Sequence, residues 1–234
     1  MKLITFELFK AFPEVVASFS TRDDGDMRVR DTDSTGEERR THFFKKSGVS
    51  PKRVISISAA HAADVIRVGE REAGAVMKRV DGLITSDSGI YLSVTAADCL
   101  VLYLYDPDSK TLGLLHAGWR GLARGIVSKA LHQFSEPSRV RVVVAPFIQA
   151  CHFEVQQDVV AAFAAHPEAV IQRDERVFVD LGAVALRQLL EAGVSSEYIE
   201  ISEECTACLV DRYFSYRRDG EPLHVMAAVL GMKE

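Results

Sequence analysis

Residues 90–121 read IYLSVTAADCLVLYLYDPDSKTLGLLHAGWRG, and this stretch holds three strand-like runs in close succession. The runs are Ile90–Thr95, Leu100–Tyr105 and Thr111–His116, each dominated by aliphatic, aromatic or β-branched residues. The connections between them are too short for a crossover helix, which parallel neighbours would need. We therefore expect an α+β fold with mixed sheets.

Working outward, the hydrophobic pattern places further strands and helices on both sides of this stretch. Strands are predicted at Arg53–Ser58, Gly82–Thr85, Val140–Ala145 and Leu223–Leu230, and in the N-terminal run MKLITFELFKAF. Helices are predicted near residues 37–47 and at Gly121–Phe134, Val155–Ala165 and Leu181–Ala192, the last ending at Gly193. The polar stretch from Thr21 to Arg40 is expected to be an exposed loop. Neither a repeat nor a Pro- or Ser-rich linker divides the chain, so residues 1–234 are expected to form a single domain.

Composition excludes several classes of protein. The chain has 234 residues, 28 Lys and Arg against 33 Asp and Glu, and a net charge of −5, with no dense basic block, so a nucleic-acid partner is not expected. No apolar run approaches the ~20 residues of a membrane helix, and the N-terminus lacks the features of a signal peptide, so we expect a cytoplasmic protein without a membrane partner. Its four cysteines are then expected to be reduced.

Three residues with reactive side chains stand at predicted strand ends: His61, Cys99 and His116. Two imidazoles and a thiolate suit Zn²⁺, and three protein ligands leave a fourth position for water or substrate. Such a zinc lowers the pKa of a bound water to about 7. Alternatively, Cys99 is a nucleophile with a histidine as its base. From spacing alone, purely structural roles for all three are also open.

Neighbouring residues suggest supporting roles. Asp98 is predicted to orient a ligand histidine or to act as a general base, the alternative being a capping role in a turn. The Cys205-Thr-Ala-Cys208 spacing fits a redox motif or a zinc knuckle, but it lacks a thioredoxin-like context and a second ligand pair.

Taken together, the chain resembles the laccase-domain (multicopper polyphenol oxidase-like) family, whose members are also described as purine nucleoside phosphorylases. The resemblance runs from about Ser18 to the C-terminus. It is carried, besides His61, by Phe19-Ser-Thr-Arg, Asp81-Gly-Leu-Ile-Thr, Ala96-Ala-Asp-Cys, His116-Ala-Gly-Trp-Arg-Gly, Cys151-His-Phe-Glu-Val and Phe214-Ser-Tyr-Arg-Arg-Asp-Gly. The chain departs from the family pattern at Ala59, Ala62, Ala145, His152 and His224.

The resemblance implies a zinc site formed by His61, Cys99 and His116, with copper as the alternative metal. It implies attack of phosphate on a purine nucleoside, which gives the free base and ribose 1-phosphate. Adenosine deamination and phosphorolysis of S-methyl-5′-thioadenosine are also implied. The implied fold is a layered α/β/β/α arrangement, similar to cysteine hydrolases of the cytotoxic necrotizing factor type. A homodimer is compatible with the sequence, which does not fix an oligomeric state.

From chemistry and motif position, we expect Arg22, Arg120 and Arg217 to neutralise the phosphate. Catalysis is assigned to Cys99 and Asp98. A laccase-type copper cluster is excluded, because it needs about ten histidines, many as His-x-His pairs, whereas this chain has seven and none are two apart. Two alternatives stay open: a Cys–His amidohydrolase that edits peptidoglycan precursors, and a non-catalytic metal-binding domain.

Overall fold

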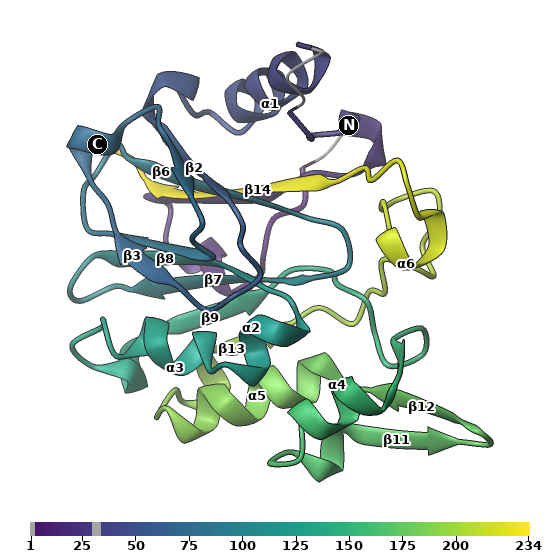
Figure 1. The fold of residues 1–234 in the computed structure, drawn as a ribbon. Coiled ribbons are helices and arrows are strands. Elements are labelled where there is room, and N and C mark those ends of the chain that lie inside the picture. The colour runs from purple at the N-terminus through teal and green to yellow at the C-terminus, as the bar shows by residue number, and fades with distance from the viewer. Residues whose placement is uncertain (1–2, 30–33) are drawn as a thin grey trace.

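Two mixed β-sheets lie face to face in the centre of the molecule, and helices cover the outer face of each (Figure 1). The computed structural model describes residues 3–29 and 34–234. The first sheet has the strand order β1 (Val15–Phe19), β14 (Met226–Met232), β6 (Tyr91–Ala96), β2 (Val54–Ser58) and β4 (Val76–Lys78). The second has the order β13 (Ile199–Ile201), β9 (Arg141–Val144), β7 (Leu100–Asp106), β8 (Thr111–Ala117), β5 (Gly82–Thr85) and β3 (Val65–Arg67). Each contains parallel and antiparallel pairs, which confirms the predicted mixed sheets.

Strand β7 shows why the central stretch is apolar throughout. Alternate residues of a strand point to opposite faces of the sheet. Accordingly, Leu100, Leu102 and Leu104 pack among the helices, whereas Tyr103 and Tyr105 pack between the two sheets. Both faces of the strand are therefore buried, and neither carries a polar stripe.

Helices form the two outer layers. On one side, Phe43 and Phe44 of α1 pack on Tyr91 and Val229 of the five-stranded sheet. On the other side, α2, α3 and α5 cover the six-stranded sheet. The helices are α1 (Thr35–Lys46), α2 (Trp119–Ala123), α3 (Ile126–Leu131), α4 (Gln157–Ala162), α5 (Leu181–Glu191) and α6 (Tyr216–Asp219). The layer order is thus the expected α/β/β/α.

Short elements complete the architecture. A small third sheet has the order β10 (Glu154–Val155), β12 (Arg176–Val179) and β11 (Val170–Arg173). The 3-10 helices are Leu8–Ala11, Arg22–Asp24, Pro51–Arg53, Glu70–Glu72, Pro137–Arg139, Pro167–Ala169 and Ser196–Tyr198. The sequence analysis did not predict the short strands β3, β4, β10, β11, β12 and β13, because a run of two to four residues shows little hydrophobic periodicity.

The prediction of an N-terminal strand is wrong for the residues that the structure describes. Ile4 makes only an isolated bridge with Phe19, and Leu8–Ala11 form a 3-10 helix. The carboxylate of Glu200 accepts a hydrogen bond from the Leu8 N–H at 2.7 Å, which satisfies one free donor at the start of this helix. Phe6 reaches the core by itself and lies 4.8 Å from the Tyr103 ring centre.

Two predicted helices are divided or shortened. The expected helix Gly121–Phe134 is two helices, α2 and α3, because Gly125 between them adopts a left-handed conformation at φ +73°. The expected helix Val155–Ala165 begins later, because Val155 pairs with Val177 in the small sheet. In contrast, α5 ends as predicted, with Gly193 at φ +94°.

The predicted polar loop from Thr21 to Arg40 is only partly a loop, and its residues 30–33 lie outside the described part. Arg22–Asp24 form a 3-10 helix, and α1 begins at Thr35. Asp26 is buried, and its carboxylate accepts a hydrogen bond from the Val225 N–H at 3.0 Å. This contact anchors the first half of the segment beside β14.

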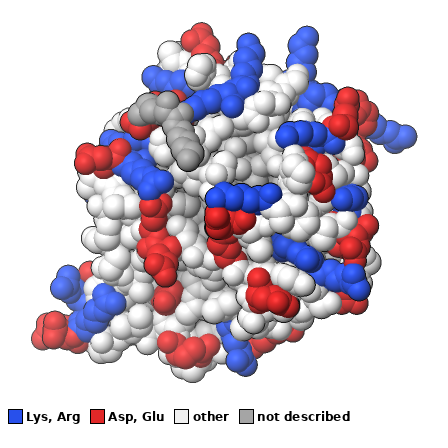
Figure 2. Space-filling model, turned by 180° about the vertical axis from the view of Figure 1, so that it is seen from behind, with Lys and Arg blue, Asp and Glu red and all other residues white. Residues whose placement is uncertain are grey.

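The charges on the surface are distributed as the composition suggests. Acidic and basic side chains are intermixed on the face in Figure 2, as expected for a small net charge. None of the described helices is long and apolar enough to cross a bilayer.

One buried hydrogen bond joins the two sheets and provides a test of their stacking. The Tyr103 hydroxyl on β7 donates to the Ser18 carbonyl oxygen on β1 at 2.8 Å. We expect Tyr103→Phe to lower the free energy of unfolding by about 1 kcal/mol, because it removes one hydrogen bond with little change of shape. Tyr105→Phe is the control, since the Tyr105 hydroxyl contacts a partly exposed Glu14 carboxylate and water can replace it. Equal effects in urea denaturation would contradict this interpretation.

Candidate functional site

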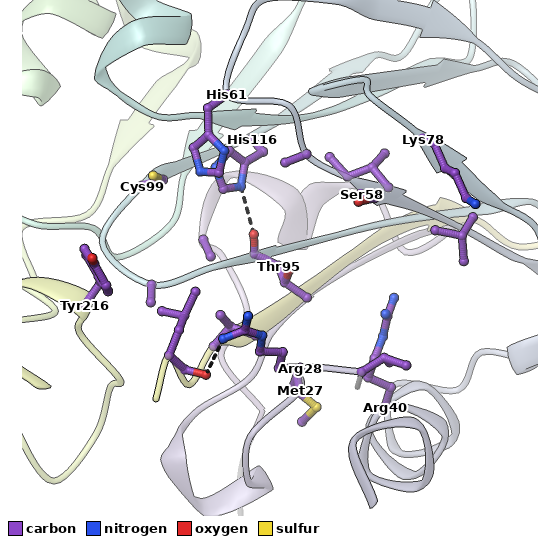
Figure 3. Close-up of a pocket in the computed structure, with 18 of the residues that line it drawn as sticks. Met27, Arg28, Arg40, Ser58, His61, Lys78, Thr95, Cys99, His116 and Tyr216 are labelled. Atoms are coloured by element: carbon purple, nitrogen blue, oxygen red, sulfur yellow. Dashed lines mark hydrogen bonds between the residues drawn. The ribbon is translucent and has the colours of Figure 1, made fainter. Parts of the chain in front are cut away.

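His61, Cys99 and His116, hereafter the triad, converge at the ends of different strands (Figure 3). His61 follows β2, Cys99 lies in the connection from β6 to β7, and His116 is the penultimate residue of β8. Their potential ligand atoms lie within 4.8 Å of one another. The structure therefore brings together the three residues that the sequence singled out.

The two ring nitrogens of His116 have different environments. Nδ1 lies 2.8 Å from the Thr95 carbonyl oxygen, so this nitrogen carries the proton and donates it. Nε2 then presents its lone pair, and it is buried without a hydrogen-bond partner among the described residues. A buried acceptor without a donor is what a bound cation would satisfy, and a backbone carbonyl that fixes the other nitrogen is typical of ligand histidines.

Ionisation in the triad also favours a cation. Burial, reinforced by nearby His61, lowers the pKa of His116 to about 4, so its imidazole is neutral at physiological pH, as a metal ligand must be. Burial, followed by the charges of Asp98 and Asp81, raises the pKa of the Cys99 thiol to about 12. Without a cation this thiol stays protonated, which makes it a poor nucleophile.

Asp81 is a supporting residue that the sequence reasoning did not single out, although its motif was noted. Its fully buried carboxylate accepts hydrogen bonds from the backbone N–H groups of Ala60, His61 and Ala62 at 2.7–2.9 Å. Its carbonyl oxygen accepts the His116 N–H at 2.7 Å. Asp81 thus holds the His61 loop, in which His61 adopts φ +54°, and fixes the strand that carries His116.

Gly118 allows the triad to pack closely. A Cβ atom at this position would lie 3.1 Å from the Cys99 Sγ and 3.6 Å from the His61 Cδ2. The backbone of the segment before α2 therefore approaches the sulfur more closely than a side chain would permit.

Asp98 lies beside Cys99 but faces away from the triad. It adopts φ +83°, and its buried carboxylate accepts hydrogen bonds from the Thr206 hydroxyl at 2.6 Å, the Ser215 hydroxyl at 3.0 Å and the Arg217 N–H at 2.7 Å. The hydrogen bonds of the Asp98 carboxylate do not support the prediction that it orients a ligand histidine, and His116 is oriented by the Thr95 carbonyl instead. The carboxylate oxygens already accept three hydrogen bonds, and these bonds join the residues before β7 to the C-terminal segment.

The triad opens into a cavity of about 740 Å³, within the range of small-molecule sites. Across the cavity from the two histidines, Arg28 and Arg40 extend from the segment between β1 and α1 and from α1 itself (Figure 3). Lys78, at the end of β4, adds a third cation, and it has no ion-pair partner within the described chain. The remaining walls include apolar side chains and the exposed ring of Tyr216.

The three arginines predicted to bind substrate do not line this cavity. Arg22 donates to the Val210 carbonyl oxygen and lies 4.7 Å from the Phe214 ring. Arg120 stacks on the Trp119 ring at 4.2 Å. Arg217 donates to the carbonyl oxygens of His152 and Glu154. The sequence analysis did not single out Arg28 and Arg40, because they belong to the polar stretch Thr21 to Arg40, where no pattern distinguishes them from the other charged residues.

A second cluster consists of Cys151, His152, Cys205 and Cys208, hereafter the Cys3His cluster, and its potential ligand atoms also lie within 4.8 Å of one another. The objection that Cys205 and Cys208 lack a second ligand pair is therefore wrong, because the fold supplies that pair from a loop 53 residues earlier in the chain. This pairing is a long-range contact, which spacing within the motif cannot reveal.

Relatives of known sequence share most of the chain. A protein called purine nucleoside phosphorylase YlmD from Geobacillus stearothermophilus is 32% identical over 78% of this chain and 73% of its own length. The protein of the same name from Bacillus subtilis is 27% identical over 94% of this chain and 90% of its own.

Solved structures share the fold. YlmD from Geobacillus stearothermophilus superposes with a TM-score of 0.90 at 28% identity, covering 95% of this chain and 93% of that one. YfiH from Bacillus licheniformis superposes with a TM-score of 0.92 at 24% identity, covering 99% and 96%. The family profile described as multi-copper polyphenol oxidoreductase laccase matches residues 17–233, and the chain therefore belongs to this family.

Proposed function

We propose that this protein is a zinc-dependent purine nucleoside phosphorylase whose active site is the triad with its cavity. The observation that carries the proposal is one cavity that is lined both by the triad, whose donors suit a metal ion, and by three basic side chains, Arg28, Arg40 and Lys78. The names of the relatives support the same reaction class.

The residues of the triad fit a zinc ion. The unpartnered Nε2 of His116, the neighbouring His61 imidazole and the Cys99 thiol are the N and S donors that zinc prefers. A zinc ion held by three protein ligands supplies a Lewis acid with one position open to substrate. The cation would also stabilise the Cys99 thiolate against the nearby carboxylates of Asp81 and Asp98.

The basic residues of the cavity account for the second substrate. Phosphate carries up to two negative charges near neutral pH, and guanidinium and ammonium groups bind it by charge-assisted hydrogen bonds. An oxygen of hydrogen phosphate forms a bond to C1′ of the nucleoside while the C1′–N9 bond breaks. The electron pair of the broken bond stays on N9, and the purine takes up the proton that hydrogen phosphate gives up, directly or through water. Free base and ribose 1-phosphate are the products.

Apolar groups of the cavity account for the purine and the sugar. Met27, Ile57 and Val225 provide an apolar wall, and the Tyr216 ring is exposed beside them. Aromatic faces bind planar bases by stacking. Adenosine, inosine, guanosine and S-methyl-5′-thioadenosine all present this combination of planar base and ribose.

Deamination of adenosine at the same site requires C6 of the base, rather than C1′, to approach the metal, and the assay below separates the two reactions. The Cys–His amidohydrolase alternative needs a reactive Cys99 thiolate without a metal, and burial of this thiol opposes it.

The first test measures metal content and turnover together. Protein purified without added metal is expected to contain zinc, and to release adenine from adenosine only when phosphate is present. Cys99→Ala is expected to lose one equivalent of zinc and at least about a hundredfold in kcat, because two histidines alone hold zinc weakly. Zinc retained with activity lost would instead favour a thiol nucleophile, and inosine formed without phosphate would indicate deamination.

The cationic wall gives a second prediction. Replacing Lys78 or Arg40 with Met should raise the KM for phosphate about tenfold, the loss of about 1.4 kcal/mol expected for one charge-assisted hydrogen bond. The KM for the nucleoside should change less. Arg120→Met is the matched control, because Arg120 stacks on Trp119 outside the cavity. A larger effect at Arg120 would restore the assignment made from the sequence.

The role of Asp98 gives a third prediction. Asp98→Asn places an amide N–H₂ group among three donors, so we expect a loss of about 2 kcal/mol in the free energy of unfolding and a lower zinc occupancy. The shape of the pH–rate profile of the remaining active protein should not change. Loss of one limb of that profile with unchanged stability would instead identify Asp98 as the general base.

A further inference from the structure

The Cys3His cluster offers four donor atoms for a metal ion, and it shares no residue with the triad. His152 Nδ1 lies 3.2 Å from the Cys151 Sγ, 3.3 Å from the Cys208 Sγ and 3.9 Å from the Cys205 Sγ. The Cys151 and Cys208 sulfurs are 3.6 Å apart. All three cysteines are free thiols.

These separations lie within about 0.3 Å of those expected in a tetrahedral zinc site. With Zn–S bonds of about 2.3 Å and Zn–N bonds of about 2.0–2.1 Å, tetrahedral angles place the ligand atoms about 3.5–3.8 Å from one another. Four protein ligands fill the coordination shell, which is typical of structural zinc and leaves no position for substrate. The triad, in contrast, has three ligands and opens into a cavity.

The backbone around Cys205 is arranged to stabilise a thiolate. The Gln149 N–H points to the Cys205 Sγ at 3.4 Å, and the N–H groups of Ala207 and Cys208 also contribute. A turn that directs N–H groups at a sulfur suits a metal-bound thiolate.

The cluster joins two segments that have little regular structure of their own. Cys151 and His152 lie in the loop after β9, and Cys205 and Cys208 lie in the stretch before α6. Beside the cluster, an isolated bridge between Phe147 and Cys205 pairs the two backbones. A metal bound by side chains from both segments would fasten them, and its binding free energy would add to folding.

The fastened segment also supports the triad. Thr206 lies inside the Cys205–Cys208 turn and donates to the Asp98 carboxylate, as do Ser215 and the Arg217 N–H further along. Asp98 in turn precedes Cys99. The cluster is thus linked to the triad through hydrogen bonds to a single buried carboxylate.

We propose that Cys151, His152, Cys205 and Cys208 bind a second, structural zinc ion that fastens residues 205–217 to the loop after β9. This proposal does not depend on the reaction at the triad.

The test counts zinc on the full chain purified under reducing conditions. We expect about two zinc ions per chain in the unmodified protein and about one in Cys208→Ala. Cys208→His, which keeps a zinc ligand, should retain both. His61→Ala should lose the other zinc, so failure of the triad and failure of the cluster are distinguishable.

Cobalt substitution adds a readout that does not depend on turnover. The thiolate-to-cobalt absorption should be dominated by the Cys3His cluster, with three sulfurs, and should survive in His61→Ala but fall in Cys208→Ala. If Cys208→Ala fails to fold, alkylation of the unmodified protein serves instead: Cys151 and Cys208, both exposed, should react only after a chelator is added. Immediate alkylation, a zinc content that Cys208→Ala leaves unchanged, or a Cys151–Cys208 disulfide found by mass spectrometry would each overturn the proposal.

Discussion

The buried carboxylate of Asp98 is the constraint on which the site depends. Between β6 and β7 the chain leaves one sheet and enters the other, and it does so in the three residues that precede Leu100. This reversal requires Asp98 at φ +83°, a conformation that costs a non-glycine residue about 1–2 kcal/mol. Three donors from the C-terminal segment offset that cost by satisfying both carboxylate oxygens. Cys99 is therefore positioned by residues more than a hundred places later in the sequence.

Asp81 fixes the backbone around His61, as Asp98 fixes the backbone before Cys99. Together, the two carboxylates place negative charge near the Cys99 thiol. Each is buried and fully engaged by hydrogen bonds, so each fixes backbone rather than binding a ligand directly. Their negative charges nevertheless disfavour the thiolate form of Cys99. A cation among the three side chains, as proposed above, would offset both the desolvation of the thiolate and its repulsion from the carboxylates. Burial and the two carboxylates thus make Cys99 a poor nucleophile on its own, and the same surroundings favour a cation beside its sulfur.

The sequence predicted the parts of the structure that depend on local pattern or on recognisable motifs. The strands on either side of Cys99, the helix that ends at Gly193 and the convergence of His61, Cys99 and His116 belong to this class, and so does the layered arrangement implied by the resemblance. The errors have a common physical origin in tertiary contacts. Leu8 begins a 3-10 helix because Glu200 accepts its N–H, and Val155 joins a strand because Val177 lies beside it. Cys205 and Cys208 gained their second ligand pair only through the fold, and His152 was noted solely as a departure from the family pattern.

The elements that carry the site residues explain why the convergence of the triad was easier to predict than the basic and aromatic lining of the cavity. The triad residues stand at the ends of buried strands, where sheet geometry fixes the backbone and short motifs reflect it. Arg28, Arg40 and Tyr216 instead come from the polar segment before α1, from α1 and from α6, which lie at the edge of the stacked sheets. Under the proposed function, one metal-binding scaffold would serve different substrates, and Arg28, Arg40 and Tyr216, which line the cavity, would decide which substrate this chain accepts.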